Sequence, residues 1–242
     1  MKKMIVLAVG FIMALGSSTS VFCADATFNL DVNSAYISRG WTYNDGIVLQ
    51  PSIDILKGGF DINIWGNMDI GDYDGALDSG EFSELDLAMY YSRSFDKLTL
   101  TGGIIEYVYP QTDESGGAKS TVELYLAGSF TVLEGLSLGL NAYYDYDEYK
   151  DTIYSTLGLT YSVPVNDKLG LTAGLLAGYV ERDEEFGESG FNEYKVSLKA
   201  SYALTEMIGV AAHLNYTDAI DDDVLPFVDV NTFGGVSVNC KY

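Results

Sequence analysis

Apolar and polar residues alternate with a period of two over long stretches of this chain. From Leu136 onward, Leu138 and Leu140 fall on one face of an extended segment, while Ser137 and Asn141 fall on the other. The same alternation recurs in residues 122–132, 169–179 and 194–202. Because successive side chains of a β-strand point to opposite faces, the pattern predicts strands, and about ten residues suffice for a tilted strand to cross a membrane.

Twelve segments follow this pattern, and their connections alternate between two kinds. The segments cover residues 28–39, 47–57, 59–70, 82–94, 97–109, 119–132, 136–146, 152–163, 168–181, 191–203, 207–217 and 227–242. Five connections are short (LKGG, SFDK, VLEG, PVND and LTEM), and the other six are mostly longer and acidic. This arrangement predicts an all-β fold, a membrane-spanning antiparallel up-and-down β-barrel of about 12 strands, whose last strand pairs with its first.

The chain finishes on GGVSVNCKY, an alternating stretch that ends at Tyr242. Soluble domains usually leave their last residues loose and polar. In a barrel the last strand closes the sheet, and we expect Tyr242 to share its lipid face with Val230, Val236 and Val238. A terminal aromatic resembles the signal that barrel-assembly machinery reads, so Tyr242 is the candidate assembly signal. A secreted β-sandwich or lectin-like domain also alternates, but the even strand number, the alternating loops and tyrosines near strand ends favour the barrel.

The first residues have the layout of a secretory signal peptide. MKK is positively charged, MIVLAVGFIMALG is apolar, and SSTSVFCADA is small and weakly polar. We expect residues 1–26 to be removed, with cleavage near 23–26, and residues 27–242 to form the barrel. A retained signal anchor is the alternative, which the short apolar run disfavours. A lipoprotein anchor at Cys23 is disfavoured because Phe22 stands where those signals need a small residue.

Charge and cysteine content exclude two kinds of protein. Removing residues 1–26 takes away two lysines and one aspartate and leaves 11 Lys and Arg against 34 Asp and Glu. A nucleic-acid partner requires a basic face for the phosphates, which so acidic a chain does not offer. Only Cys240 then remains, so the fold is not a small secreted domain held by intrachain disulfides.

The sequence contains no recognisable enzyme signature. His213, the sole histidine, lies on the polar face of its segment with Asn215. Outer-membrane phospholipases pair such a histidine with a serine two residues on, where this chain has Asn215, so we expect a hydrogen-bonding side chain and no general base. The acidic loops lack the ligand spacing of a calcium loop. We therefore expect no catalytic residues, no metal site and no cofactor.

The stretch YISRGWTYNDGIVLQPSIDI, followed by GFDINIWGNMDI, carries a family resemblance. It resembles the N-terminal pattern of the TorF family of porins, also known as Gcw_chp-type outer-membrane β-barrel proteins, over the first 70 residues. The resemblance implies an outer-membrane barrel with porin-like function and brings no substrate. It is carried by Tyr36, Arg39-Gly40, Asp45-Gly46, Gln50-Pro51 and Trp65-Gly66-Asn67.

The same residues have a physical role of their own. Gly40 lets the chain turn beside the bulky Trp41, and the NDG sequence at Asn44 suits a tight turn. Pro51 cannot donate to a sheet ladder, so a bulge or an unpaired site is expected there. We interpret the cluster as a structural corner and not as a binding site.

Strand phase also predicts which residues line the lumen. If Leu30 and Val32 face lipid, Asp31 and Asn33 face inward. Because both signs of charge occur, the predicted pore-lining residues either set up a transverse field at a constriction or pair with one another. They are Arg39, Asp54, Asp61, Glu84, Asp86, Glu123, Lys195, Lys199 and Asp229.

These features favour a channel in the outer membrane of a Gram-negative bacterium, for passive diffusion of small hydrophilic solutes. Outer-membrane lipid, lipopolysaccharide and the barrel-assembly machinery are its expected partners, and both termini are expected in the periplasm. Twelve strands lie between the filled barrels of eight and the open ones of 16 to 18. The alternative is therefore a closed structural or adhesive barrel whose acidic loops bind divalent cations, lipopolysaccharide or a partner.

An open pore is expected to prefer cations, because acidic loops create a negative potential at its mouth. Lys195 and Lys199 oppose this preference from inside, and we expect Glu84, Asp86 and Glu123 to neutralise them. The loop acids are Asp72, Asp74, Asp78, Asp113, Glu114, Asp147, Glu148, Asp183, Glu184, Glu185, Glu188, Asp221, Asp222 and Asp223.

Overall fold

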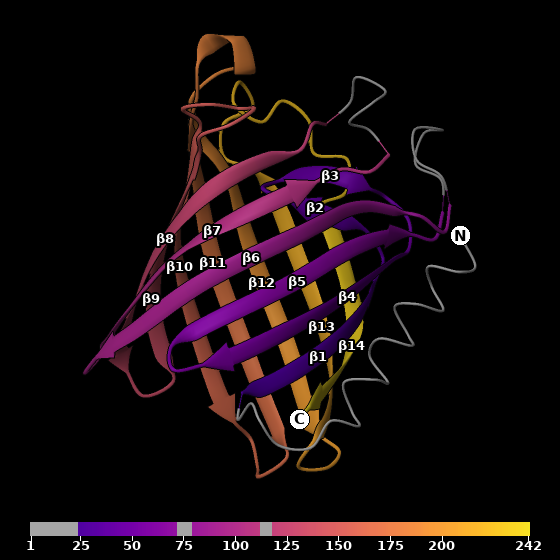
Figure 1. Ribbon diagram of the computed structural model, residues 1–242, viewed down its shortest axis with the longest axis vertical. Coiled ribbons are helices and arrows are strands. Elements are labelled where there is room, and N and C mark those ends of the chain that lie inside the picture. The colour runs from indigo at the N-terminus through magenta and orange to yellow at the C-terminus, as the bar shows by residue number, and fades with distance from the viewer. Residues whose placement is uncertain (1–23, 72–78, 112–117) are drawn as a thin grey trace.

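The computed structural model describes residues 24–71, 79–111 and 118–242 and shows a closed barrel (Figure 1). Its wall consists of twelve antiparallel strands, each hydrogen-bonded to its neighbours in sequence order. The strands of the wall are β1 (Asp25–Asn33), β4 (Val48–Lys57), β5 (Phe60–Asp69), β6 (Phe82–Phe95), β7 (Leu98–Val108), β8 (Thr121–Leu133), β9 (Leu136–Asp145), β10 (Ile153–Pro164), β11 (Leu169–Glu181), β12 (Gly190–Ala203), β13 (Ile208–Ala219) and β14 (Thr232–Lys241). The predicted all-β up-and-down barrel is thus confirmed.

The last strand closes the barrel against the first. β1 pairs with β14 from Thr27 and Lys241 at one end to Asn33 and Gly235 at the other. Beyond the ladder, the Tyr242 amide donates to the Ala26 carbonyl at 2.8 Å, and the Ala26 amide donates back at 3.1 Å. The beginning of β1 and the end of the chain therefore lie together at the end of the barrel that carries the short turns (Figure 1).

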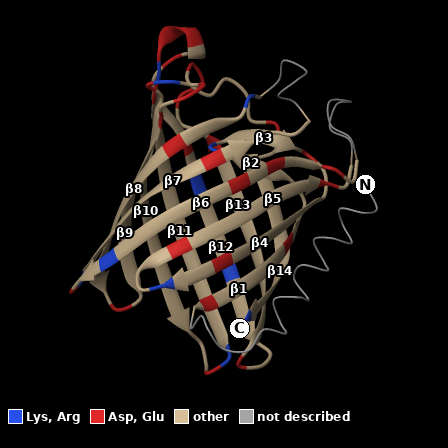
Figure 2. Ribbon diagram, in the orientation of Figure 1, with Lys and Arg blue, Asp and Glu red and all other residues tan. Residues whose placement is uncertain are grey.

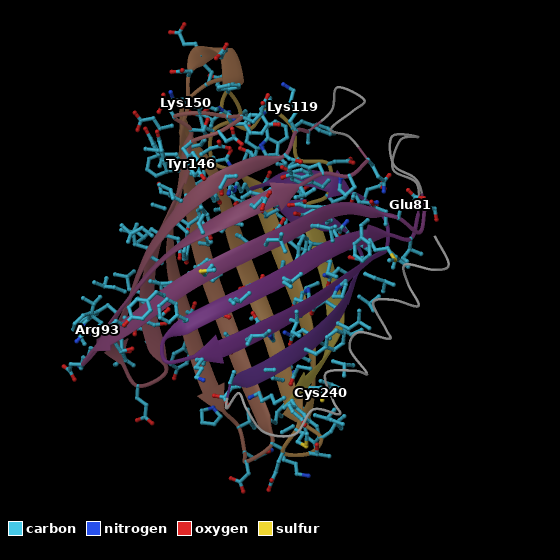
Figure 3. All side chains as sticks on the ribbon, in the orientation of Figure 1. Glu81, Arg93, Lys119, Tyr146, Lys150 and Cys240 are labelled. Atoms are coloured by element: carbon cyan, nitrogen blue, oxygen red, sulfur yellow. The ribbon has the colours of Figure 1, made fainter. Side chains whose placement is uncertain are left out.

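The outer surface is an apolar band bordered by aromatic side chains, as a lipid-facing wall requires. Leu126, Leu140 and Leu157, in the middle of their strands, are more than half exposed. Figure 3 shows side chains all along the wall, with Arg93 towards the short turns and Tyr146 towards the long loops. Near the short turns the exposed aromatic residues include Phe60, Tyr91, Phe95, Phe130, Tyr161 and Tyr202, and near the long loops they include Tyr146, Tyr179, Phe191, Tyr194 and Tyr216. These two girdles are the ones that the tyrosines near strand ends predicted.

The first predicted strand, residues 28–39, was too long. β1 ends at Asn33, and a separate two-stranded sheet follows, formed by β2 (Tyr36–Ser38) and β3 (Trp41–Asn44). The chain reverses between them at Arg39 and Gly40, whose φ angles are 52° and 80°. The chain therefore leaves the wall after Asn33, and the left-handed conformations of Arg39 and Gly40 turn it back on itself.

The last predicted strand, residues 227–242, was also too long. β14 begins at Thr232, and residues 220–231 form the connection from β13. Val230 therefore lies outside the closing strand, whereas Val236 and Val238 are exposed on its outer face as expected. Asp229 lies in the same connection and is exposed, so it does not point into the lumen from a strand.

The sheet is interrupted at Pro51, as predicted from the absence of an amide hydrogen in proline. The β4–β5 ladder pairs Leu49 with Met68 and next pairs Ser52 with Trp65, so Gln50 and Pro51 are skipped. On its other side Pro51 still lies opposite Leu30 of β1. The register is unchanged across the gap, which makes it an unpaired site and not a bulge.

Helical structure is minor. A single turn of 3-10 helix, η1 (Glu184–Phe186), sits in the β11–β12 loop. Among residues 24–71, 79–111 and 118–242, no helix has the length and apolar character to span a membrane.

The closed sheet leads to a first prediction about the folded protein. Each of the twelve wall strands is hydrogen-bonded on both sides, so unfolding in detergent requires the whole ladder to open. We expect unheated protein to migrate differently from boiled protein on a detergent gel and to fractionate with membranes. Recovery in the soluble periplasm, with one mobility before and after boiling, would contradict a membrane barrel.

Candidate functional site

The β2–β3 hairpin folds into the mouth of the barrel, at the end that carries the long loops (Figure 1). One side of it is tied to the wall through a row of buried amides. The Asn44 side chain of β3 donates to Asp69 of β5 at 2.6 Å, and Asn67 donates to the same carboxylate at 3.1 Å. The row continues to Gln50 and Asn33, with hydrogen bonds of 2.9 and 2.7 Å. Buried polar groups of this kind are stable only when paired, so the row fixes the base of the hairpin.

The tip of the hairpin carries Arg39, which reaches the opposite wall. Its guanidinium donates to both carboxylate oxygens of Glu123 on β8, at 2.8 and 2.6 Å. The ring centroids of Tyr154 and Tyr143 lie 4.7 and 5.0 Å from the guanidinium carbon, and the Tyr107 hydroxyl also donates to Glu123 at 2.8 Å. A bidentate ion pair with a carboxylate and contact with aromatic ring faces both stabilise a buried guanidinium.

A third set of contacts holds the turn of the hairpin. Asn192 of β12 donates to the Arg39 carbonyl at 2.7 Å, and the Val230 amide donates to the Thr42 hydroxyl at 3.2 Å. Gly40 packs so closely that a Cβ there would lie 2.5 Å from Leu225. The hairpin is therefore anchored to β5, β8 and β12 at once, and it crosses the mouth.

Two cavities lie in the lumen beside the hairpin. The upper chamber has a volume of about 580 Å³ and is lined by the hairpin and by strands β6 to β12. The lower chamber, of about 370 Å³, is lined mainly by threonine, serine and glycine on β7 to β12, near the short turns. Four residues line both chambers: Asn141, Thr156, Leu176 and Lys195. The two cavities therefore meet along the inner wall of β9 to β12.

The structure brings together five of the predicted pore-lining residues. Arg39, Glu84, Asp86, Glu123 and Lys195 all line the upper chamber, although they come from the hairpin and from three strands. The expectation that Glu123 neutralises the lysines is wrong, because Glu123 is paired with Arg39. Glu84 instead accepts a hydrogen bond of 2.7 Å from the Tyr36 hydroxyl of the hairpin.

The other predicted positions lie apart from this group. Asp54 accepts hydrogen bonds from Asn29 and Asn63, at 3.2 and 2.7 Å. Asp61 lies on the next strand of the same wall, and Lys199 lies opposite His213 in the β12–β13 ladder. Asp229 lies in the β13–β14 loop and not on a wall strand, so it does not have the inward strand phase that was predicted for it. Of the loop acids, Asp72, Asp74, Asp78, Asp113 and Glu114 lie outside the described residues.

Four further residues face the lumen that the sequence analysis did not single out. Tyr107, Tyr143, Tyr154 and Glu193 all point into the upper chamber. Each belongs to the polar face of an alternating segment, and that phase was the signal that could have found them. Glu193 is almost fully buried and accepts hydrogen bonds from the Tyr154 and Thr217 hydroxyls, at 2.6 and 3.0 Å.

Acidic residues outnumber basic ones among the residues that line the upper chamber, and Figure 2 shows Asp and Glu on the strands and loops at this end of the barrel. Within the described residues, Glu84, Asp86, Asp145 and Glu193 form no ion pair. Glu84, Asp145 and Glu193 accept hydrogen bonds from hydroxyls, Asp145 also accepts from a backbone amide, and the side chains of Glu84 and Asp86 hydrogen-bond to each other. Burial and the nearby Glu84 raise the pKa of the Tyr109 hydroxyl, just beyond β7, so this phenol stays protonated as a donor. In the part of the chain that the structure covers, no group of three or more His, Cys, Asp and Glu is placed to hold a metal ion.

Known structures share this architecture. The KdgM porin is 12% identical with a TM-score of 0.56, and the match covers 90% of this chain and 99% of KdgM. The NanC porin is 10% identical with a TM-score of 0.53, over 90% of this chain and 98% of NanC. The COG4313 outer membrane channel from Pseudomonas putida F1 is 10% identical with a TM-score of 0.53, over 94% and 98%. At these identities the likeness establishes the fold, that of an outer-membrane porin-like barrel.

No curated protein matches the sequence. A family model does: the family described as "Bacterial protein of unknown function (Gcw_chp)" matches residues 17–235. This match extends far beyond the N-terminal motif that carried the resemblance. The chain therefore belongs to the Gcw_chp family.

Proposed function

We propose that this protein is an outer-membrane channel for the passive diffusion of small hydrophilic solutes. The observation that carries the proposal is the pair of adjoining chambers, which share Asn141, Thr156, Leu176 and Lys195 on β9 to β12. They provide a polar route past the hairpin from the long loops towards the short turns. In a closed structural barrel, side chains would fill this space.

The hairpin limits what passes, because it occupies part of the mouth. Solutes must travel beside Arg39 and then past Lys195, through a lumen narrower than that of 16- to 18-stranded porins. Proteoliposomes containing the folded protein should therefore swell in an isotonic pentose and not in an isotonic solution of a long oligosaccharide. Absence of swelling in both solutes would support the closed structural or adhesive barrel instead.

The structural similarity to KdgM does not imply that this chain binds the ligand of KdgM. One KdgM structure is a complex with disordered oligogalacturonate, which is an anionic oligosaccharide. In this chain the upper chamber contains carboxylates without ion-pair partners, which repel an anion. We therefore assign small neutral and cationic solutes, and we assign no catalytic role to any residue.

Cation preference is the second part of the proposal, and it leads to a prediction. Glu84, Asp145 and Glu193, which form no ion pair within the described residues, and the acidic loops create a negative potential, which Lys195 opposes at the junction of the chambers. In a KCl gradient the reversal potential should show cation preference, and this preference should grow as salt is lowered, because screening weakens. Anion preference that grows at low salt would show that Lys195 dominates.

We further propose that residues 1–26 are removed as a signal peptide and that both ends of the mature chain lie in the periplasm. Residues 1–23 lie outside the described part of the structure. Thr27, which remains after this cleavage, pairs with Lys241 at the end with the short turns, and this agrees with the orientation. Outer-membrane lipid and lipopolysaccharide then surround the apolar band.

Tyr242 is expected to matter for assembly and little for transport. Its side chain is 76% exposed and lines neither chamber, so its removal costs the folded barrel little packing. Deleting it should lower the amount of folded barrel in the outer membrane several-fold, while the surviving molecules conduct normally. Extending the chain past an intact Tyr242 with one serine is a control that separates the terminal position from the aromatic side chain. Normal accumulation of the truncated protein would mean that the signal lies elsewhere.

A further inference from the structure

We propose that the upper chamber is a binding site for small organic cations, in particular ammonium compounds with a short apolar stem. The inference rests on the proposed channel function and names the class of solute that its lumen retains. At about 580 Å³ the chamber has the size of an ordinary small-molecule pocket.

The first observation is that the chamber already holds a cation of its own. The Arg39 guanidinium lies over the rings of Tyr154 and Tyr143 and pairs with Glu123. Aromatic faces and a carboxylate are the groups that recognise organic cations. The chamber therefore has the chemistry to hold a second one.

The second observation is an excess of acceptors. Glu84 and Asp86 lie two residues apart on β6, both facing the chamber, and neither is ion-paired within the described residues. Their side chains hydrogen-bond to each other, so the two carboxyl groups share one proton. Of the bases that line the chamber, Arg39 is engaged by Glu123, Arg182 donates to the carbonyls of Glu188 and Val224, and Lys195 lies at the junction with the lower chamber.

The third observation concerns hydrogen bonds that are not made. Three buried side-chain atoms among the described lining residues lack a partner: the acceptor oxygens Asp86 Oδ1 and Asn192 Oδ1, and the hydroxyl Thr152 Oγ1, which can donate or accept. Asn192 is only 3% exposed. Because unpaired buried acceptors are costly, a ligand rich in N–H donors suits this lining better than one rich in acceptors.

The walls favour an organic cation over a metal ion. Four aromatic residues line the same chamber as Glu84 and Asp86: Tyr36, Trp41 and Tyr43 in the hairpin and Tyr109 just beyond β7. Aromatic surfaces pack against an alkyl stem and attract an ammonium group, whereas Mg²⁺ and Ca²⁺ require a shell of oxygen ligands. The described residues supply no group of three metal-ligating side chains.

The experiment uses 1,4-diaminobutane as the probe, with 1,4-butanediol and succinate as neutral and anionic compounds of the same length. Binding to the folded protein in detergent is measured by calorimetry at low salt, and block of the channel current is measured in bilayers. We expect the diamine alone to bind and to block. We expect Asp86→Asn to weaken its binding about tenfold or more, the size expected for losing one hydrogen bond to a charged group.

The matched control is Asp54→Asn, which removes an inward carboxylate that lies outside the chamber lining. It should bind the diamine as the wild type does. Trp41→Leu, which keeps every charge, should also weaken binding, and a heat-induced gel shift shows that each variant is folded. Equal binding of the diol, or unchanged binding in both Asp86→Asn and Trp41→Leu, would overturn the inference. A silent bilayer with intact calorimetric binding would instead contradict the channel and leave the binding site standing.

Discussion

Replacing Arg39 by alanine should raise the single-channel conductance roughly twofold or more and admit larger solutes, since constriction geometry sets permeation. The Arg39 side chain spans the mouth to Glu123, and it is the only hairpin contact with β8 that carries charge on both sides. Its removal also uncovers the ring faces of Tyr143 and Tyr154. The hairpin then stays tied to β5 through Asn44 and to β12 through the Arg39 carbonyl, while its ion pair with β8 is lost.

The same substitution should cost stability. The Glu123 side chain is 5% exposed and would be left charged without its partner. Breaking such a pair from one side costs about 3 kcal/mol. The double variant Arg39→Ala with Glu123→Gln should recover part of that loss while keeping the raised conductance. Wild-type conductance in both variants would show that the hairpin does not limit the pore.

Replacing Gly40 by alanine should displace the hairpin from Leu225 and Glu193, against which its turn packs. Gly40 has a φ of 80°, and its Cβ would lie 2.5 Å from Leu225 and 3.2 Å from the Cβ of Glu193. The left-handed conformation alone costs about 1 kcal/mol, and the clash adds to it. We expect reduced thermal stability together with higher and noisier single-channel currents.

Gly58→Ala is the matched control for this prediction. Gly58 also has a positive φ, 59°, but it lies in the β4–β5 turn and a Cβ there meets nothing within 4 Å. It should show the backbone strain without any change in conductance. Equal effects of the two variants on the current would contradict a role for the packing of Gly40 against the β13–β14 loop.

The wall of the barrel could be predicted from the sequence because its inner and outer surfaces differ chemically. Leu138 and Leu140 face lipid while Asn141 faces the lumen, so apolar and polar residues alternate along the strand with a period of two. The short turns could also be placed, since Gly58, Gly59 and Gly135 supply the positive φ angles that tight connections need.

The hairpin could not be predicted in the same way. Residues 36–44 fold into the mouth of the barrel and are not part of its wall, so the contrast between lipid and lumen that marks a wall strand is absent there. Residues 36–39 were therefore predicted as a continuation of the first strand. Arg39 and Glu123 are 84 residues apart in the chain, and a single sequence does not reveal that they meet. The inward phase of Glu84, Asp86 and Lys195 was predictable, but their assembly around one chamber depends on the hairpin that faces them.

The most direct test of the channel is planar-bilayer recording of the purified, refolded wild-type protein, with folding established beforehand by the heat-induced gel shift. Adjoining chambers beside an anchored hairpin predict small, uniform, stepwise current increments that reverse at a cation-selective potential in a KCl gradient. Bilayers that stay silent after insertion of folded protein would contradict the account and show that the hairpin seals the barrel.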